Sequence, residues 1–170
     1  MERILASAKK VAEQADVFVV TSEETPLQFE ANRLKHAQSK QSTLVAVRVV
    51  RNGKIGYSAG TSLENGQSLV EMAAAAAEFG MTANLELPTA TNYPRIDIFD
   101  AAVESLPLET MVEQGDDAIA LLRKHNPELL CDAWTSKGVV SVRIMNSRGG
   151  HAEYKESFSN LSVSANLIRG

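Results

Sequence analysis

The chain has 170 residues and a formal charge of −4, from 17 Lys and Arg against 21 Asp and Glu, which argues against a general attraction to DNA or RNA. Hydrophobic residues make up 44% of it, with 10 glycines and 5 prolines, which indicates a globular protein rather than a disordered or fibrous one. Cys131 is the only cysteine, so an internal disulfide is excluded and a cytoplasmic location is favoured. No apolar run is long enough for a membrane helix, and the N-terminal apolar stretch is too short for a signal peptide.

The first elements follow from hydrophobic spacing. Apolar residues at helical spacing predict a helix over residues 2–15, ended by Asp16 and followed by a buried strand at 17–20. Alternation predicts strands at 27–31 and 44–50. In the second of these, Ala46 and Arg48 point away from Val45, Val47 and Val49. Asn52-Gly53 predicts a two-residue hairpin turn with a return strand at 54–58, because both central residues of a type I′ turn need positive φ.

A second helix follows this hairpin and ends at Gly80, a natural C-cap. Two capping boxes, Thr61 with Glu64 or Ser68 with Glu71, leave its start open. The residues expected on its apolar face are Leu69, Met72, Ala73, Ala76 and Phe79.

The rest of the chain begins with a Pro-containing linker at 81–107. A third helix is predicted from near Pro107 to just before Pro127, and strands follow at 129–135, 139–145, 152–158 and 161–168. The expected fold class is α+β, with two related α/β units, mainly antiparallel sheet and helices packed on one face. The expected units are 1–80 and 108–170.

The two halves resemble copies of each other. Thr21-Ser22 matches Thr135-Ser136, and Asn32 matches Asn146, both at an offset of 114 residues. The strand that ends at Arg51 resembles the one that ends at Arg169, but only Arg51 is followed by a hairpin and a helix. The second unit is therefore expected to be truncated, and the chain to be a fragment of a longer protein.

One short motif suggests chemistry. Gly56-Tyr57-Ser58-Ala59-Gly60 fits the G-x-S-x-G elbow of serine hydrolases, which makes Ser58 a candidate nucleophile. The preceding Asn-Gly hairpin argues against it, because the elbow belongs to a parallel sheet and this strand is antiparallel to its neighbour. A small serine hydrolase that uses Ser58 stays an alternative to the main hypothesis, as does a protein-interaction module without a role in proteolysis.

Other residue types give no catalytic, cofactor or metal site. His36, His125 and His151 lack the spacing of a zinc motif, Cys131 reads as a buried inert thiol, and Asp97 and Asp100 read as a solvated turn. No nucleotide-binding motif occurs.

The remaining polar and aromatic candidates are also interpreted as structural residues rather than as parts of a functional site. A basic patch lacks interleaved aromatic residues, which disfavours nucleic acid, and Trp134 is expected in the core. Asn and Gly at two positions are expected to form tight turns. The patch comprises Arg33, Lys35, His36 and Lys40, and the turn residues are Asn52, Gly53, Asn146, Gly149 and Gly150.

Several of these segments together resemble the N-terminal region of the TldD/PmbA peptidase family, closer to its PmbA-like branch. The resemblance spans nearly the whole chain, and the order of its loose motifs is more specific than any single one. The motifs are Phe29–Leu34, Val45–Val49, Gly53–Ser58 with the Ala-rich helix that follows, Ile98–Asp100 and Val142–Gly149.

The resemblance implies a cytoplasmic proteolytic system, in which TldD-like and PmbA-like subunits pair to cleave unfolded peptides and process peptide precursors. Some members of the family were first named modulators of DNA gyrase. Its zinc site is a His-Glu-x-x-x-His motif of the TldD-like subunit, which nothing in this sequence matches. The resemblance therefore implies a non-catalytic N-terminal region that encloses substrate and pairs with a TldD-like partner or with itself, away from membranes, with zinc only in the catalytic subunit.

Overall fold

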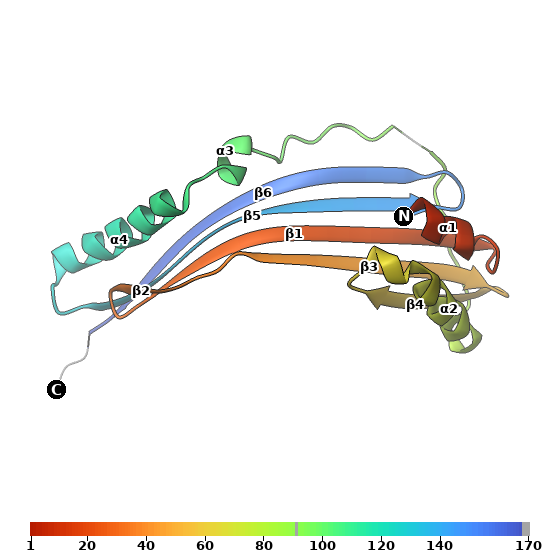
Figure 1. Cartoon of the computed structure of the whole chain (residues 1–170), viewed down its shortest axis with the longest axis horizontal. Coiled ribbons are helices and arrows are strands. Elements are labelled where there is room, and N and C mark those ends of the chain that lie inside the picture. The colour runs from red at the N-terminus through yellow and green to blue at the C-terminus, as the bar shows by residue number, and fades with distance from the viewer. Residues whose placement is uncertain (91, 168–170) are drawn as a thin grey trace. The chain divides into compact units, whose positions relative to one another are not determined.

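The computed structural model describes residues 1–90 and 92–167. Its fold is α+β, as predicted, with an antiparallel sheet in the order β4-β3-β1-β5-β6 and β2 paired with β1 (Figure 1). The expected strand end at Ile168, with Arg169 and Gly170, lies outside the described residues. The strands are β1 (Gln14–Glu30), β2 (Arg33–Ala37), β3 (Lys40–Arg51), β4 (Lys54–Gly60), β5 (Leu130–Asn146) and β6 (His151–Asn166). The helices are α1 (Glu2–Ala8), α2 (Gly66–Ala76), α3 (Ala101–Glu104) and α4 (Leu108–His125), with the 3-10 turns η1 (Leu63–Asn65) and η2 (Ala77–Phe79).

The chain divides into two compact units, each assembled from three separate segments. Unit 1 comprises Met1–Thr21, Ser42–Asp97 and Ser141–Tyr154. Unit 2 comprises Ser22–Gln41, Ile98–Val140 and the chain from Lys155 onward. The contiguous division into 1–80, 81–107 and 108–170 follows the order of the sequence instead, and it stays a prediction.

The core of unit 1 is built on the predicted alternation of β3. Val45, Val47 and Val49 are buried, whereas Ala46 and Arg48 are only half-buried. Ala15, Val17 and Val19 of β1 join them beneath α1 and α2. The other members of this core are Ile4, Leu5, Ala8, Leu69, Val70, Ala73 and Ala77.

The first helix is shorter than predicted, because the chain turns into the sheet before residue 15. Helix α1 ends at Ala8, and the N–H groups of Lys10 and Val11 bond three residues back, as in a tightened last turn. The N–H of Glu13 then bonds the carbonyl of Val50 in β3 at 2.9 Å. Asp16 therefore lies within β1, rather than ending a helix, and the expected strand at 17–20 is the middle of a longer one.

The second helix also differs from its prediction. Ser62 caps the 3-10 turn η1 by accepting from the N–H of Glu64, and α2 itself starts at Gly66, so neither predicted capping box forms. The buried face consists of Leu69, Val70, Ala73, Ala74 and Ala77. Met72, Ala76 and Phe79, predicted to be on that face, are exposed. Alanines lie on several sides of α2, so the hydrophobic pattern alone does not determine which side of the helix packs against the sheet.

The hairpin after β3 forms as predicted. Asn52 and Gly53 have φ values of 51° and 68°, and β3 and β4 pair antiparallel with Val47 opposite Ser58. The carboxylate of Glu13 accepts from the N–H of Asn52 at 2.8 Å, which holds this turn to the start of β1.

Unit 2 has its own core beneath α4, which starts after Pro107 and ends before Pro127, as predicted. Leu27 and Phe29 of β1 alternate inward, and Cys131 and Ala133 of β5 do the same. Met111 and Ile119 of α4 pack against these residues, and Val163 of β6 contacts the cluster. Helical spacing also predicts Leu108 on the apolar face of α4, together with Met111 and Ile119, but Leu108 is exposed.

The last four predicted strands are two long ones. Residues 136–138, expected to separate two strands, continue β5, where Thr135 and Ser136 are buried. A Cβ at Gly138 would lie 2.4 Å from the ring of Phe158, so this glycine allows β6 to pack closely rather than making a turn. The predicted strands at 152–158 and 161–168 are likewise parts of β6.

Candidate functional site

The Gly-x-Ser-x-Gly segment is the face of β4 that packs against α2. A Cβ at Gly56 would lie 2.0 Å from the carbonyl oxygen of Ala73, and one at Gly60 would lie 3.2 Å from Leu69 Cδ2. Between them, Ser58 Oγ donates to the Leu69 carbonyl oxygen at 2.6 Å. The spacing of two residues places all three on one side of the strand. Helix packing thus accounts for the motif, and a nucleophilic Ser58 stays a prediction.

The histidines lie apart on exposed elements. His36 is on β2, His125 is the last residue of α4, and His151 starts β6 with its Nδ1 3.5 Å from the Gly149 carbonyl oxygen. Within residues 1–90 and 92–167, three or more His, Cys, Asp or Glu side chains nowhere gather as metal ligands would. The described residues therefore do not fit a metal, and no metal-dependent step is assigned to them.

The other titratable candidates have structural surroundings. Asp100 caps α3 by accepting from the Ala102 N–H at 2.8 Å, whereas Asp97 is exposed. Cys131 is a fully buried free thiol in the core of unit 2. The basic residues Arg33, Lys35, His36 and Lys40 are all exposed on β2 and the start of β3.

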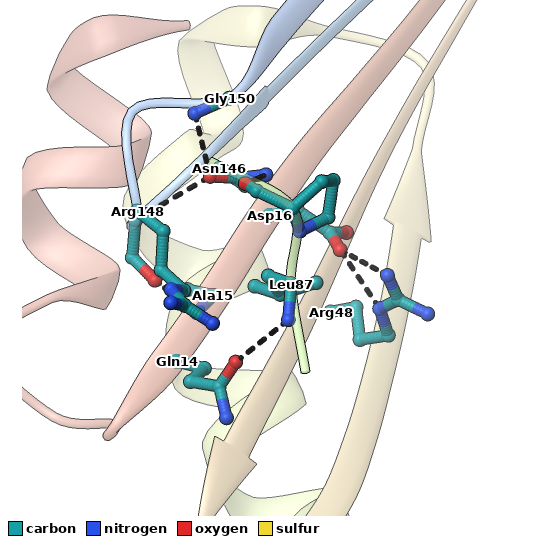
Figure 2. A network of polar contacts seen from close by, with 10 residues as sticks. Gln14, Ala15, Asp16, Arg48, Leu87, Asn146, Arg148 and Gly150 are labelled. Carbon is teal, nitrogen blue, oxygen red and sulfur yellow. Dashed lines mark hydrogen bonds and ion pairs between the residues drawn. The ribbon is translucent and has the colours of Figure 1, made fainter. Parts of the chain in front are cut away.

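A partly buried ion pair lies in unit 1, on the face of the sheet away from α1 and α2. Arg48 of β3 binds Asp16 of β1 through two nitrogens, with Nε 2.9 Å from Oδ2 (Figure 2). Burial lowers the pKa of Arg48, but the hydrogen bonds and charges of Asp16 and Tyr57 outweigh it and raise that pKa above its usual value. Arg48 is therefore always charged, and the pair joins two neighbouring strands rather than exchanging protons.

The turn at Asn146–Gly150 centres on the buried side chain of Asn146. Its Oδ1 accepts from the N–H groups of Arg148 and Gly150, both at 2.9 Å, and its Nδ2 donates to the Pro88 carbonyl at 2.8 Å. Gly149 has a φ of 86°. Figure 2 shows this turn beside the linker and the start of β1, where Gln14 accepts from the Leu87 N–H at 3.1 Å. The network fixes the linker of unit 1.

The outer edge of β6 in unit 2 is a different kind of feature, because a strand at the end of a sheet has no neighbouring strand on one side. β6 ends the strand order. Its outer side is contacted at Ser157, whose N–H bonds the Ile98 carbonyl at 3.1 Å and whose Oγ accepts from the Asp100 N–H. Backbone groups alternate along a strand, so Ser159 and Leu161 direct theirs to the same side as Ser157.

Unit 1 exposes three large apolar side chains on α2, on η2 and just after η2. Phe79 is 91% exposed and Met81 is 81% exposed. Met72, which precedes them on α2, is 49% exposed. Three large exposed apolar side chains within residues 72–81 make this segment a candidate contact face. Sequence reasoning missed this surface, because the helical spacing of Met72 and Phe79 is also typical of residues that pack in the core.

Unit 2 has two hollows on the face of the sheet away from α4, and Trp134 lines both. Trp134 is 40% exposed, contrary to the expectation that it lies in the core. Strand alternation could have placed it, because Cys131, Ala133 and Thr135 occupy the inward positions of β5. The first hollow has a volume of about 510 Å³ and the second about 360 Å³.

A third hollow, of about 700 Å³, belongs to unit 1 and lies beside α1. Charges of both signs line it, including Arg3, Arg143, Glu2 and Glu64. Within residues 1–90 and 92–167, no helix is both long enough and apolar enough to cross a membrane.

Residues 15–78 match the family model described as PmbA/TldA metallopeptidase domain 1. Among curated proteins, the comparison returns no match. Solved structures with a similar fold include TldE from Thermococcus kodakarensis, which is 16% identical with a TM-score of 0.88 over 100% of this chain. A putative modulator of DNA gyrase from Thermotoga maritima is 16% identical, with a TM-score of 0.81 over 96% of this chain. One from Bacteroides thetaiotaomicron is 13% identical, with a TM-score of 0.86 over 98%. This chain spans only 40–41% of the length of each.

Proposed function

Through residues 15–78 the chain belongs to the TldD/PmbA family, and from that premise we propose that it is a non-catalytic N-terminal part of a TldD/PmbA-like metal-dependent peptidase. It acts in proteolysis or peptide maturation in the cytoplasm by holding an unfolded peptide and by pairing with a partner subunit. Zinc belongs to the catalytic subunit in this proposal.

The observation that carries the proposal is the outer edge of β6 in unit 2. Main-chain hydrogen bonds to a strand edge do not depend on sequence, so such an edge holds unfolded peptides of many kinds. The edge is long, because β6 continues to Asn166, nine residues beyond the contact at Ser157. Proteins usually cover or shorten such edges, and one that remains open is suited to adding a strand.

The edge is tested with Ser159→Pro, which removes one outward N–H, and with Ser159→Ala as the matched control. Ser159 is exposed, so neither change disturbs a core. A fluorescein-labelled, Thr- and Val-rich decapeptide is titrated with each variant and followed by fluorescence anisotropy. The proline variant is expected to bind at least tenfold more weakly, and the alanine variant like the wild type. Equal binding by both variants, with unchanged melting temperatures, would contradict the proposal.

Pairing with another subunit is supported by the exposed apolar residues Met72, Phe79 and Met81 of unit 1. One of the structures with this fold is TldE, and a TldD-like subunit, or a second copy of this chain, is the proposed partner. Burying one such side chain contributes roughly 1.5–3 kcal/mol.

Sedimentation velocity tests the pairing surface, on the chain alone and with a co-expressed TldD-like subunit. Phe79→Ser is expected to weaken association at least tenfold. Leu121→Ser is the control, because Leu121 is also an exposed apolar residue, at 71%, but lies on α4 of unit 2. If both variants associate like the wild type, this surface is not the pairing surface.

A further inference from the structure

The first hollow beside Trp134 is lined by an aromatic ring, carboxylates and hydroxyls. It lies within unit 2, on the open face of the sheet, and takes residues from β1, β5 and β6. The side chains that the sheet's alternation directs to this face are Gln28, Glu30, Asp132, Trp134, Ser162 and Ser164. The backbone of this site is therefore regular sheet, which holds the side chains at fixed spacing.

The charge of the hollow has one sign. Glu30 and Asp132 are the charged residues that line it. Glu30 Oε1 accepts from Gln28 Nε2 at 2.7 Å, and Asp132 Oδ1 accepts from the Ala31 N–H at 3.0 Å, which orients both carboxylates. Within the described part of the chain, neither carboxylate has a cationic partner. The charged side chains that line the hollow are therefore both acidic and lie beside an exposed indole, whereas Arg33, the register partner of Glu30 on β2, lies outside the lining.

An indole face and carboxylates both attract a cationic group. The face of Trp carries negative potential and attracts a cation more strongly than the rings of Tyr or Phe. Two carboxylates add a charge attraction, and the Ser162 and Ser164 hydroxyls can accept from N–H donors. An acidic group would meet repulsion, and an uncharged aliphatic group would leave the carboxylates without a partner.

The distance from the edge of β6 favours a long side chain. A strand added to β6 would lie two strand spacings from β5, the strand that carries Trp134. Two strand spacings are about 10 Å. Every second side chain of the added strand points to the face with Ser162 and Ser164. Only a long side chain on that strand carries a charged group as far as the indole and Asp132.

We propose that this hollow binds the ammonium or guanidinium group of a Lys or Arg side chain in an extended peptide. The inference rests on the proposed function and adds to it a preference for basic peptides. The neighbouring hollow, which shares Trp134, is lined by His36 and Lys40 and has the opposite tendency, so the preference for a cation belongs to the side with Glu30 and Asp132.

Trp134 is the only tryptophan in the chain, so its own fluorescence reports binding at this hollow. The probes are hexapeptides that differ only at their third residue, which is Lys, Arg, norleucine or Glu. The Lys and Arg peptides are expected to change the Trp134 emission saturably and to bind at least fivefold more tightly than the norleucine peptide. The difference is expected to shrink in 0.5 M salt, because screening weakens exposed charge interactions.

Variants of the full chain separate charge from folding. Glu30→Gln with Asp132→Asn removes the charge but keeps an acceptor for the Ala31 N–H, and it is expected to lose at least fivefold in Lys-peptide affinity but not in norleucine-peptide affinity. Glu113→Gln, at an exposed position of α4, is the control and is expected to bind like the wild type. Trp134→Leu, measured by calorimetry, is expected to weaken the Lys peptide as well.

The outcomes distinguish this inference from the function on which it rests. Equal binding of the Lys and norleucine peptides, or full affinity in the double variant, would overturn the cation preference while leaving peptide binding at the β6 edge intact. If no hexapeptide binds and Ser159→Pro has no effect on the decapeptide, both proposals fail.

Discussion

At the scale of single residues, close packing decides what the Gly-x-Ser-x-Gly segment does. Gly56 stands where a Cβ would lie 2.0 Å from a backbone oxygen of α2 and 2.6 Å from the Ala77 nitrogen. Backbone atoms cannot rotate away as a side chain can, so the helix itself would have to move. Ser58 contributes only one hydrogen bond to the same helix.

Gly56→Ala is therefore expected to lower the free energy of unfolding by about 2–4 kcal/mol, as an overpacked core does. Ser58→Ala is expected to cost about 1 kcal/mol or less. Urea unfolding followed by circular dichroism measures both. A fluorophosphonate is expected not to label Ser58, and labelling that is lost in Ser58→Ala would favour the serine hydrolase instead.

Asn146 carries more than its size suggests, since it satisfies two N–H groups and one carbonyl. Asn146→Ala is expected to cost about 2–4 kcal/mol, because the Gly150 N–H and the Pro88 carbonyl lose their partner in a site that is 7% exposed. Asn146→Asp keeps the acceptor and loses the donor, so its loss is expected to be smaller. The midpoints of urea unfolding compare the two. An alanine variant as stable as the wild type would mean that water replaces these bonds.

At the scale of elements, α4 lies against β1 through Gly115. A Cβ there would lie 2.4 Å from Cε2 and Cζ of Phe29, a fully buried ring. Helix propensity favours alanine over glycine by about 1 kcal/mol, but the clash opposes it.

Gly115→Ala is expected to destabilise the protein by about 1–3 kcal/mol, because a filled core resists added volume. Gln114→Ala, at the exposed neighbouring position, is expected to change stability by less than about 0.5 kcal/mol. Combining Gly115→Ala with Phe29→Leu tests the cause, since a smaller side chain at 29 is expected to recover part of the loss. A stabilising Gly115→Ala would show that propensity decides at this helix.

Local signals predicted the elements that local chemistry determines. The Asn52-Gly53 turn, the alternation of β3 and the helix after Pro107 all depend on a few neighbouring residues, and the structure confirms them. The length of β5 depends on strands distant in sequence, so the polar residues near Ser136 resembled a break. The packed side of α2 depends on β4 in the same way.

The candidate site was harder to predict, because it depends on which surfaces the fold leaves open. Trp134 is typical of a core residue when its type alone is considered. The burial of Cys131 and Ala133 on the other face of β5 shows that Trp134 lies on the uncovered face. Glu30 and Asp132 are about 100 residues apart in sequence, and nothing local in the sequence indicates that they line the same hollow. The family resemblance, in contrast, could be predicted from the order of loose motifs, and the family model matches residues 15–78.

At the scale of the whole molecule, the described residues form two hydrophobic cores with no residue in common. Ile4 belongs to the core of unit 1, and Ile119 belongs to that of unit 2. Each is almost fully buried, at 5% and 4% exposure. Substitutions that share no partner usually have additive effects on stability, whereas substitutions in contact do not.

Ile4→Val and Ile119→Val are each expected to cost about 0.5–1.5 kcal/mol, and the double variant is expected to lose the sum to within about 0.5 kcal/mol. A contrasting pair lies within one core, because a Cβ at Gly66 would be 2.3 Å from Ile4 Cγ1. Gly66→Ala is therefore expected to be less harmful when combined with Ile4→Ala, which removes the clashing atoms. Urea unfolding at constant m-value measures both cycles. A coupling above about 1 kcal/mol between Ile4 and Ile119 would mean that the two cores respond as one, since truncating either would then change the packing of the other.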